Sequence, residues 1–162
     1  MPNYVDADAD IRGKYRYSLM RKLATGEGTV LFVGLNPSTA TAKEDDHTVR
    51  RCVRFAQAWG RERLYLGNLN AWRATDPKAL PADAATAVGP CNREVLEQLV
   101  RRADLIIAAW GRHRLNSEAA TLAEWLRSLP KIHCLRLNKT GTPTHPRCVP
   151  KTAVPIKLPH AS

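Results

Sequence analysis

The chain has 162 residues, a length typical of one domain with a core of its own and of one functional site. Hydrophobic residues make up 44% and charged residues 25%, and no apolar run approaches the roughly 20 residues that span a bilayer, so the composition excludes a membrane-spanning protein. Lys and Arg number 25 against 15 Asp and Glu, a net charge of +10, which favours a polyanionic partner, nucleic acid before a membrane surface. A basic protein without such a partner remains the alternative.

The first ten residues are rich in acids and lack the basic start and apolar run of a secretion signal, so we expect a cytoplasmic protein. The four cysteines, Cys52, Cys91, Cys134 and Cys148, form no C-x-x-C pair. Zinc and iron–sulfur sites usually take two ligands from one tight turn. We therefore expect buried free thiols, no metal and no cofactor.

The N-terminal part of the chain, residues 1–28, is treated as an extension in which "YRYSLMRKL" is either a short strand or a helix, and we expect little function there. The apolar run "TVLFVG" predicts the first strand of the domain. "DDHTVRRCVRFAQAWG" has helical spacing, with Asp45 or Asp46 as the N-cap and Gly60 as the stop. "RLYLGNLNAW" predicts a second strand, and residues 75–90 a Pro-rich loop that holds at most a helical turn.

The second half of the chain repeats the alternation of helix and strand. A helix is expected from about Pro90, followed by a continuous apolar strand in "DLIIAAWG". "NSEAATLAEWLRSLP" predicts a helix capped by Asn116 or Ser117, and "KIHCLRL" a fourth strand. Residues 149–162 form a Pro-rich tail, expected to lie across the surface.

Four strands alternating with helices predict an α/β fold, a three-layer α/β/α sandwich around a central four-stranded parallel sheet, as a single domain over residues 1–162. In such sheets ligands bind beyond the carboxyl ends of the strands. Polar residues follow each predicted strand: Asn36-Pro37-Ser38, then Asn68 and Asn70, then Trp110-Gly111-Arg112-His113, then Thr144-His145-Pro146. We expect these strand ends to converge on one rim.

The stretches "GLNPSTA", "DDHTVRR", "NLNAWRATDP", "AAWG" and "GTPTHP" together resemble an uncharacterised bacterial family, domain of unknown function 1643, over nearly the whole chain. More distantly, the same order of motifs is similar to the uracil-DNA glycosylase superfamily. That resemblance implies the strand order 2-1-3-4 and an enzyme of DNA repair. It matches the G-I-N-P-G motif of the mismatch-specific branch with Gly34, Leu35, Asn36, Pro37 and Ser38.

The same resemblance matches a base-reading asparagine with Asn68 or Asn70, a W-G motif with Trp110-Gly111, and a His-Pro motif with His145-Pro146. Three departures are visible. Arg147 stands where uracil glycosylases commonly carry the serine of H-P-S-P, so their duplex-opening wedge is missing or replaced. Asn36 stands where the most active branch has an acid, and the cluster cysteines of thermophilic branches are absent.

Cleavage of a base–sugar bond needs a positioned water and a donor to the leaving base. We assign the positioning of the water to Asn36. The alternative is that Asn36 only starts an Asx turn, which needs the same residue type. We assign the donor to His145, although a His before Pro is often only a surface residue. Asp45 and Asp46 are interpreted as helix caps, in preference to the alternative that they are acids that activate the water.

Recognition of a base is expected from Asn68 or Asn70, by the bidentate contact of an amide, with a β-turn role as the alternative. Trp72 or Trp110 could stack on the base, although tryptophans are more often part of a core. Arg112, His113 and Arg147 are candidates for phosphate contacts. The alternative is an exposed basic loop that binds no phosphate, because it has the same appearance in sequence.

The sequence therefore predicts an N-glycosidic-bond hydrolase of DNA glycosylase type, a monomer that acts on uracil or another altered base in DNA. Two alternatives stay open: a non-catalytic nucleic-acid-binding module of the same fold, and a protein that binds a free nucleotide or nucleoside. All three place the ligand between Asn36 and His145, in one cleft.

Overall fold

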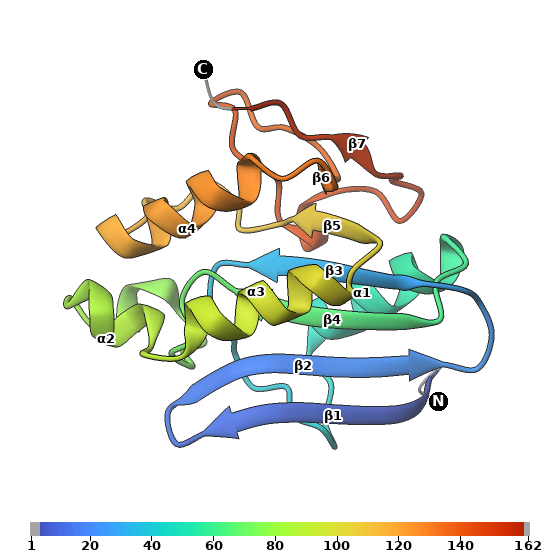
Figure 1. Ribbon diagram of the computed structural model, residues 1–162, viewed down its shortest axis with the longest axis horizontal. Helices are drawn as coiled ribbons and strands as arrows, with labels where there is room; N and C mark the ends of the chain where they lie inside the picture. Colours follow the sequence, from blue (N-terminus) through green and yellow to red (C-terminus); the bar gives the residue numbers. More distant parts are fainter. Residues whose placement is uncertain (1–3, 161–162) are drawn as a thin grey trace.

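The sheet of the protein has seven strands in the part of the chain that the structure, a computed structural model, describes, residues 4–160 (Figure 1). Their order across the sheet is β1-β2-β4-β3-β5-β6-β7. The strands are β1 (Tyr4–Arg12), β2 (Tyr15–Leu23), β3 (Thr29–Gly34), β4 (Arg63–Asn68), β5 (Leu105–Ala108), β6 (Ile132–Cys134) and β7 (Ile156–Lys157).

Strand directions make this a mixed sheet. β3 pairs in parallel with β4 and β5, and β5 pairs in parallel with β6. The pairs β1–β2, β2–β4 and β6–β7 are antiparallel. The predicted α/β class is confirmed. The prediction of four strands is wrong, because a hairpin before the first predicted strand and a short strand after the last one extend the sheet at its two edges.

The N-terminal segment is part of the sheet rather than an extension. In β2 the side chains of Leu19, Arg21 and Leu23 are buried at every second position, the period of a strand with one covered face, while Tyr17 packs in the core on the opposite face. Because β2 is antiparallel to β4, the start of β2 lies beside the end of β4. The amide of Arg16 accordingly donates to the carbonyl of Ala71, with N and O 2.9 Å apart.

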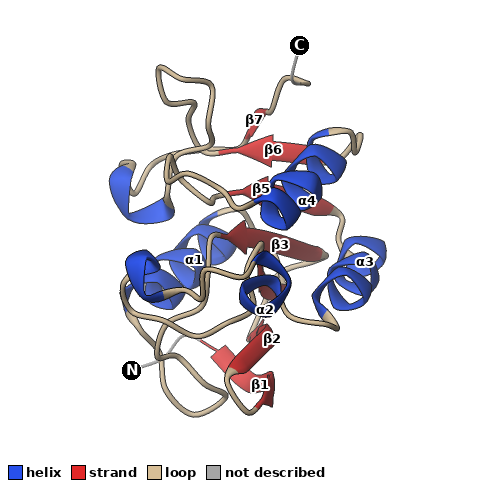
Figure 2. Cartoon of the chain, turned by 90° about the vertical axis from the view of Figure 1, so that its left-hand side faces the viewer, coloured by secondary structure: helices blue, strands red, loops and turns tan. Residues whose placement is uncertain are grey.

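Helices cover both faces of the sheet (Figure 2). One face carries α1 (His47–Ala58), whose Val49, Cys52 and Phe55 pack with Phe32 of β3. The other face carries α3 and α4, whose buried side chains pack with Leu31 and Ile106. The bounds of the remaining elements are α2 (Ala84–Val88), α3 (Asn92–Arg102), α4 (Ser117–Arg127), η1 (Pro77–Ala79) and η2 (Pro146–Cys148).

Two predicted helix caps are confirmed. The Asp46 carboxylate accepts from the amide of Val49 at 2.9 Å, and the Asn116 side chain accepts from the amide of Ala119 at 2.8 Å. Side chains with short acceptors stabilise the free amides of a first helical turn, so α1 and α4 begin where the sequence indicated.

The four cysteines are free thiols. Cys52 and Cys134 are buried as expected, Cys91 is half-buried, and Cys148 is exposed, contrary to the expectation. Residues 149–160 of the tail run over the surface as predicted, except that β7 adds to the sheet and that Val149 and Leu158 are buried; residues 161–162 lie outside the described residues. Within residues 4–160 no helix combines the length and apolar character that crossing a membrane requires.

Candidate functional site

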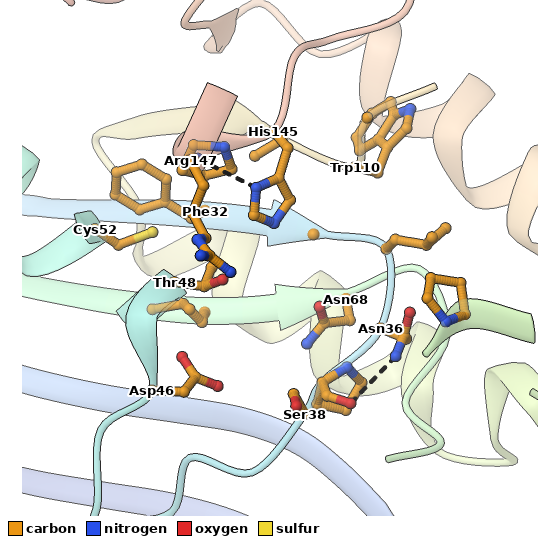
Figure 3. Close-up of a pocket in the computed structure, with 18 of the residues that line it drawn as sticks. Phe32, Asn36, Ser38, Asp46, Thr48, Cys52, Asn68, Trp110, His145 and Arg147 are labelled. Atoms are coloured by element: carbon orange, nitrogen blue, oxygen red, sulfur yellow. Dashed lines mark hydrogen bonds between the residues drawn. The ribbon is translucent and has the colours of Figure 1, made fainter. Parts of the chain in front are cut away.

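A pocket of about 740 Å³ lies where the inner strands end (Figure 3). Its walls come from the segments that follow β3, β5 and β6, from the end of β4, from the first turn of α1 and from the start of β2. This volume is within the range of small-molecule sites, about 300–1,000 Å³. The carboxyl ends of parallel strands meet at one edge of a sheet, which explains why segments far apart in the sequence share the pocket.

Most residues predicted for the site line this pocket, Asn36 and His145 among them. The lining includes Gly34, Leu35, Asn36, Pro37, Ser38, Asn68, Trp110, Gly111, Arg112, His113, His145 and Arg147. The two residues predicted as the catalytic pair, more than a hundred positions apart, therefore face one cavity.

Asn70 and Trp72 do not line the pocket, contrary to the prediction. Asn70 is 2% exposed; its Nδ2 donates to the Leu35 carbonyl at 3.2 Å and its Oδ1 accepts from Asn116 Nδ2 at 2.8 Å. It therefore joins the loop after β3 to the start of α4. Trp72 forms an isolated β-bridge with Tyr15, and their rings meet edge to face at 5.7 Å.

Asn68 is the asparagine that reaches the pocket. Its side chain is 5% exposed, and its Nδ2 has no hydrogen-bond partner among the described residues. A buried amide without a partner costs about 1–3 kcal/mol. The carbonyl of Asn68, by contrast, accepts from Asn92 Nδ2 at 2.8 Å, so the backbone is held while the side-chain donor is left for a ligand.

The Asn36 amide is oriented by its nitrogen. Nδ2 donates to the Ala74 carbonyl at 2.7 Å and to the Pro37 carbonyl at 3.2 Å. Its Oδ1 makes no hydrogen bond with a described residue, so the Asx turn that was the alternative does not form; Figure 3 shows this oxygen opposite the bonded nitrogen. The arrangement leaves one oriented acceptor at the pocket wall.

His145 begins the 3₁₀ helix η2, and its ring points into the pocket (Figure 3). Nδ1 accepts from the amide of Arg147 at 3.1 Å, so the proton of the neutral ring is on Nε2. Burial, followed by the charge of Arg147, lowers the pKa of His145 below 6.5. The ring is therefore neutral at pH 7 and presents an N–H donor.

Trp110 lines the pocket but is 2% exposed and packs in the core on the α3 and α4 face. Little of its ring is left to stack on a ligand. Asp45 acts away from the pocket, where its Oδ1 pairs with Arg21 at 2.8 Å. Asp46 caps α1 and also lines the pocket.

Sequence reasoning missed Arg16 of β2 and Phe32 of β3, two buried residues of the lining. The alternation of "YRYSLMRKL" gave no signal for Arg16, because it places Arg16 on the same side as Ser18 and Lys22; its burial coincides with the register shift of the β1–β2 pairing between Ser18 and Arg16. Among the described residues, no group of three or more His, Cys, Asp or Glu side chains could hold a metal ion.

Comparison with known proteins gives one match. The model of the family described as "Protein of unknown function (DUF1643)" matches residues 16–147. No curated protein and no solved structure matches the chain. The matched range begins at Arg16 and ends at Arg147, so it contains nearly the whole pocket lining. The chain belongs to the DUF1643 family of proteins of unknown function.

Proposed function

We propose that the protein hydrolyses the N-glycosidic bond of uracil or another altered base in DNA. The observation that carries the proposal is the composition of one pocket. It holds a neutral imidazole that presents an N–H donor, an amide with a free oxygen and a buried amide with a free nitrogen, from His145, Asn36 and Asn68.

His145 stabilises the leaving base. As the bond to the sugar breaks, negative charge develops on the base, and the Nε2–H of His145 donates to its oxygen. The interaction strengthens with that charge, so it lowers the barrier of the chemical step. Because Nδ1 is held by the Arg147 amide, the ring does not need to reorient during the reaction.

Asn36 positions the attacking water. Its Oδ1 accepts a hydrogen bond from the water, while the bonds from Nδ2 to two carbonyls keep the amide in place. An amide is not a strong base, so it orients the water toward an oxocarbenium-like sugar rather than deprotonating it in the ground state; once the C–N bond has broken and the C–O bond has formed, the water proton passes to the departing anionic base.

Asn68 recognises the base. A flipped base presents its Watson–Crick edge to the pocket, and the unpartnered Nδ2 of Asn68 donates to an acceptor on that edge. The partnerless nitrogen favours a base with a carbonyl oxygen at this position, as in uracil.

The arrangement of the inner strands supports the proposed relation to the uracil-DNA glycosylase superfamily. β4, β3, β5 and β6 are neighbours that pair in parallel, which corresponds to the expected order 2-1-3-4 when the strands are numbered from β3. The motifs matched to that superfamily follow β3, β4, β5 and β6.

An excision assay tests the proposal. The purified protein is incubated with oligonucleotides that each carry one altered base, and alkali-labile abasic sites are counted. We expect cleavage of at least one substrate and a loss of roughly 100- to 1,000-fold in rate for His145→Ala and for Asn36→Ala, with the fold retained. Absence of excision from every substrate would refute the proposal.

A second candidate, a nucleic-acid-binding module without catalysis, is favoured by one observation. Arg112, Arg136 and Arg147 are exposed residues of the pocket lining, and by the resemblance to uracil glycosylases Arg147 stands where those enzymes commonly carry the serine of H-P-S-P, so that their duplex-opening wedge is missing or replaced. Binding of DNA without excision of any base would select this candidate.

A further inference from the structure

Two buried arginines on β2 differ in what they bind. Arg21 is fully buried, and its guanidinium pairs with Asp45 at 2.8 Å and donates to the Met20 carbonyl at 2.9 Å. Arg16 is 3% exposed and makes one side-chain hydrogen bond, from Nη1 to the Ala40 carbonyl at 3.1 Å. Its Nε has no partner, and it forms no ion pair with any described carboxylate.

Arg16 nevertheless remains charged. Burial lowers the pKa of Arg16 to about 10, which is still well above neutral pH. The nearby charge of Asp46 opposes this shift, but the Asp46 carboxylate is bonded to the Val49 amide as the cap of α1. Buried charges in proteins are normally paired, so a buried guanidinium that lies near Asp46 but forms no ion pair with it indicates that a further anionic partner comes from outside the chain.

The pocket is a route by which such a partner reaches Arg16, because Arg16 lines this pocket. The lining as a whole is cationic. It contains four arginines, Arg16, Arg112, Arg136 and Arg147, and a single acid, Asp46, among residues 4–160. A site of this composition attracts anions and holds them more strongly than bulk water permits.

The depth of Arg16 restricts the form of the anion. Arg16 is buried, as is Cys52 of the same lining, whereas the other three arginines of the lining are exposed. A phosphodiester inside a strand carries a nucleotide on each side, so it reaches a side chain that is 3% exposed only if both neighbouring nucleotides enter the pocket as well. A terminal phosphate monoester is compact and offers several acceptor oxygens to one guanidinium.

We propose that Arg16 binds the phosphate monoester of a nucleotide whose base occupies the pocket, so that the substrate is a nucleoside monophosphate or the terminal nucleotide of a strand. This inference rests on the proposed function for the base, since it assumes that Asn68 and His145 contact the same ligand. It narrows the substrate class from any altered base in DNA to a nucleotide with a free phosphate.

Calorimetric titration tests the inference. Deoxynucleoside 5′-monophosphates, including deoxyuridine monophosphate, are each compared with the same nucleoside lacking the phosphate. We expect at least one monophosphate to bind roughly 10- to 100-fold more tightly than its nucleoside, the range of a charge-assisted hydrogen bond. Arg16→Gln is expected to remove this difference. Arg54→Gln, which removes an exposed arginine of α1 outside the pocket, is the matched control and should retain it.

Equal binding of monophosphates and nucleosides, absence of binding by any of them, or a difference that persists in Arg16→Gln would overturn the inference. If Arg16→Gln does not fold, Arg16→Lys keeps the charge without the Nε donor, and the Nε–H resonance of Arg16 in the wild-type protein is followed by NMR. A shift on addition of a monophosphate, but not of the nucleoside, supports the inference, and an unmoved resonance refutes it.

Two oligonucleotide substrates separate this inference from the proposed function and distinguish the sources of the phosphate. One carries the altered base at an internal position, the other at a 5′-phosphorylated end. Excision from the internal position without binding of any monophosphate retains the proposed function and refutes the inference. Excision or binding restricted to the phosphorylated end supports a strand terminus, and binding of free monophosphates alone supports a mononucleotide.

Discussion

The absence of a side chain at Gly34 leaves the space in which the amide of Asn68 lies: a Cβ atom on Gly34 would be 2.8 Å from Asn68 Oδ1. The two residues are partners in the parallel register of β3 and β4, where each strand ends at the pocket. Gly34 does not have a positive φ, so its role is to leave room for Asn68 rather than to permit an unusual backbone.

Gly34→Ala is therefore expected to displace the Asn68 amide without straining the backbone. We expect ligand affinity to fall roughly tenfold or more, because the recognition bond of Asn68 is lost or lengthened, and the unfolding free energy to fall by about 1–3 kcal/mol from overpacking. Titration and urea unfolding measure the two effects. Gly141→Ala, at a position where nothing lies within 4 Å, is the control for adding a methyl group away from the pocket, although its positive φ gives it a stability cost of its own. Unchanged ligand affinity in Gly34→Ala would contradict the assigned role of Asn68.

Asn68 and Asn70 lie two residues apart, and we expect substitution of Asn68 to affect mainly ligand recognition and substitution of Asn70 to affect mainly stability. Asn70→Ala leaves Asn116 Nδ2 without its partner and removes the weaker of two hydrogen bonds to the Leu35 carbonyl, which keeps the bond from the backbone amide of residue 70, so the unfolding free energy should fall by about 1–3 kcal/mol. Asn68→Ala removes an amide nitrogen that has no partner, so it should cost less stability while abolishing ligand recognition. Urea unfolding and ligand titration of both variants test this pair; equal losses of stability would contradict it.

Acid is expected to destabilise the protein through His145. Its folded pKa is below 6.5, mainly because the ring is buried, whereas the unfolded chain titrates near 6.5. As pH falls through this interval the unfolded state binds a proton that the folded state does not, so the contribution of the neutral ring is present above pH 6.5 and is lost below it. Urea unfolding at a series of pH values measures this dependence.

His145→Gln should reduce that pH dependence, because the titrating group is gone. His160→Gln, which changes an exposed histidine near the C-terminus, is the matched control and should leave it unchanged. If both variants show the wild-type pH profile between pH 5 and 7, another group is responsible for the acid sensitivity.

Asp46 allows a test of which residue activates the water. Asp46→Asn keeps an oxygen that can accept from the Val49 amide, so we expect little loss of stability and an excision rate within a few-fold of wild type. Asp46→Ala removes the cap and should cost about 1 kcal/mol of unfolding free energy. A well-folded Asp46→Asn variant with a loss of rate near 1,000-fold would instead identify Asp46 as the base.

Nucleic-acid binding should depend on salt through the exposed arginines of the pocket lining. If Arg147 contacts one phosphate of DNA, Arg147→Gln should lower the slope of log affinity against log salt by about 0.9. Arg102 is exposed at the end of α3, shortly before the start of β5, whereas the pocket lies where the strands end. Arg102→Gln should therefore leave the slope unchanged. Equal slopes for wild type and Arg147→Gln, measured by fluorescence anisotropy, would show that Arg147 makes no phosphate contact.

The sequence was sufficient to place the pocket and most of its walls. The apolar run Val30–Val33 and the polar Asn36 shortly after it marked the end of a strand, and His145 lies in the loop after the last predicted strand. The carboxyl ends of parallel strands meet at one edge of the sheet, so these residues were expected to lie together. Local patterns also located α1 and α4, because the capping residues Asp46 and Asn116 act on amides only three positions away. Periodicity and capping are local properties, so the amino-acid order alone determines them.

Tertiary pairing decided what local patterns could not. The residues from 15 to 23 became a strand because β2 pairs with β4, and this pairing brought Arg16 to the pocket. Asn68 and Asn70 have the same chemistry in sequence, yet Asn68 reaches the cavity while Asn70 bonds to Leu35 and Asn116. Trp110 lines the pocket, but its side chain is packed in the core. Which polar group is left without a partner depends on contacts between distant segments, and such contacts exist only once the chain has folded.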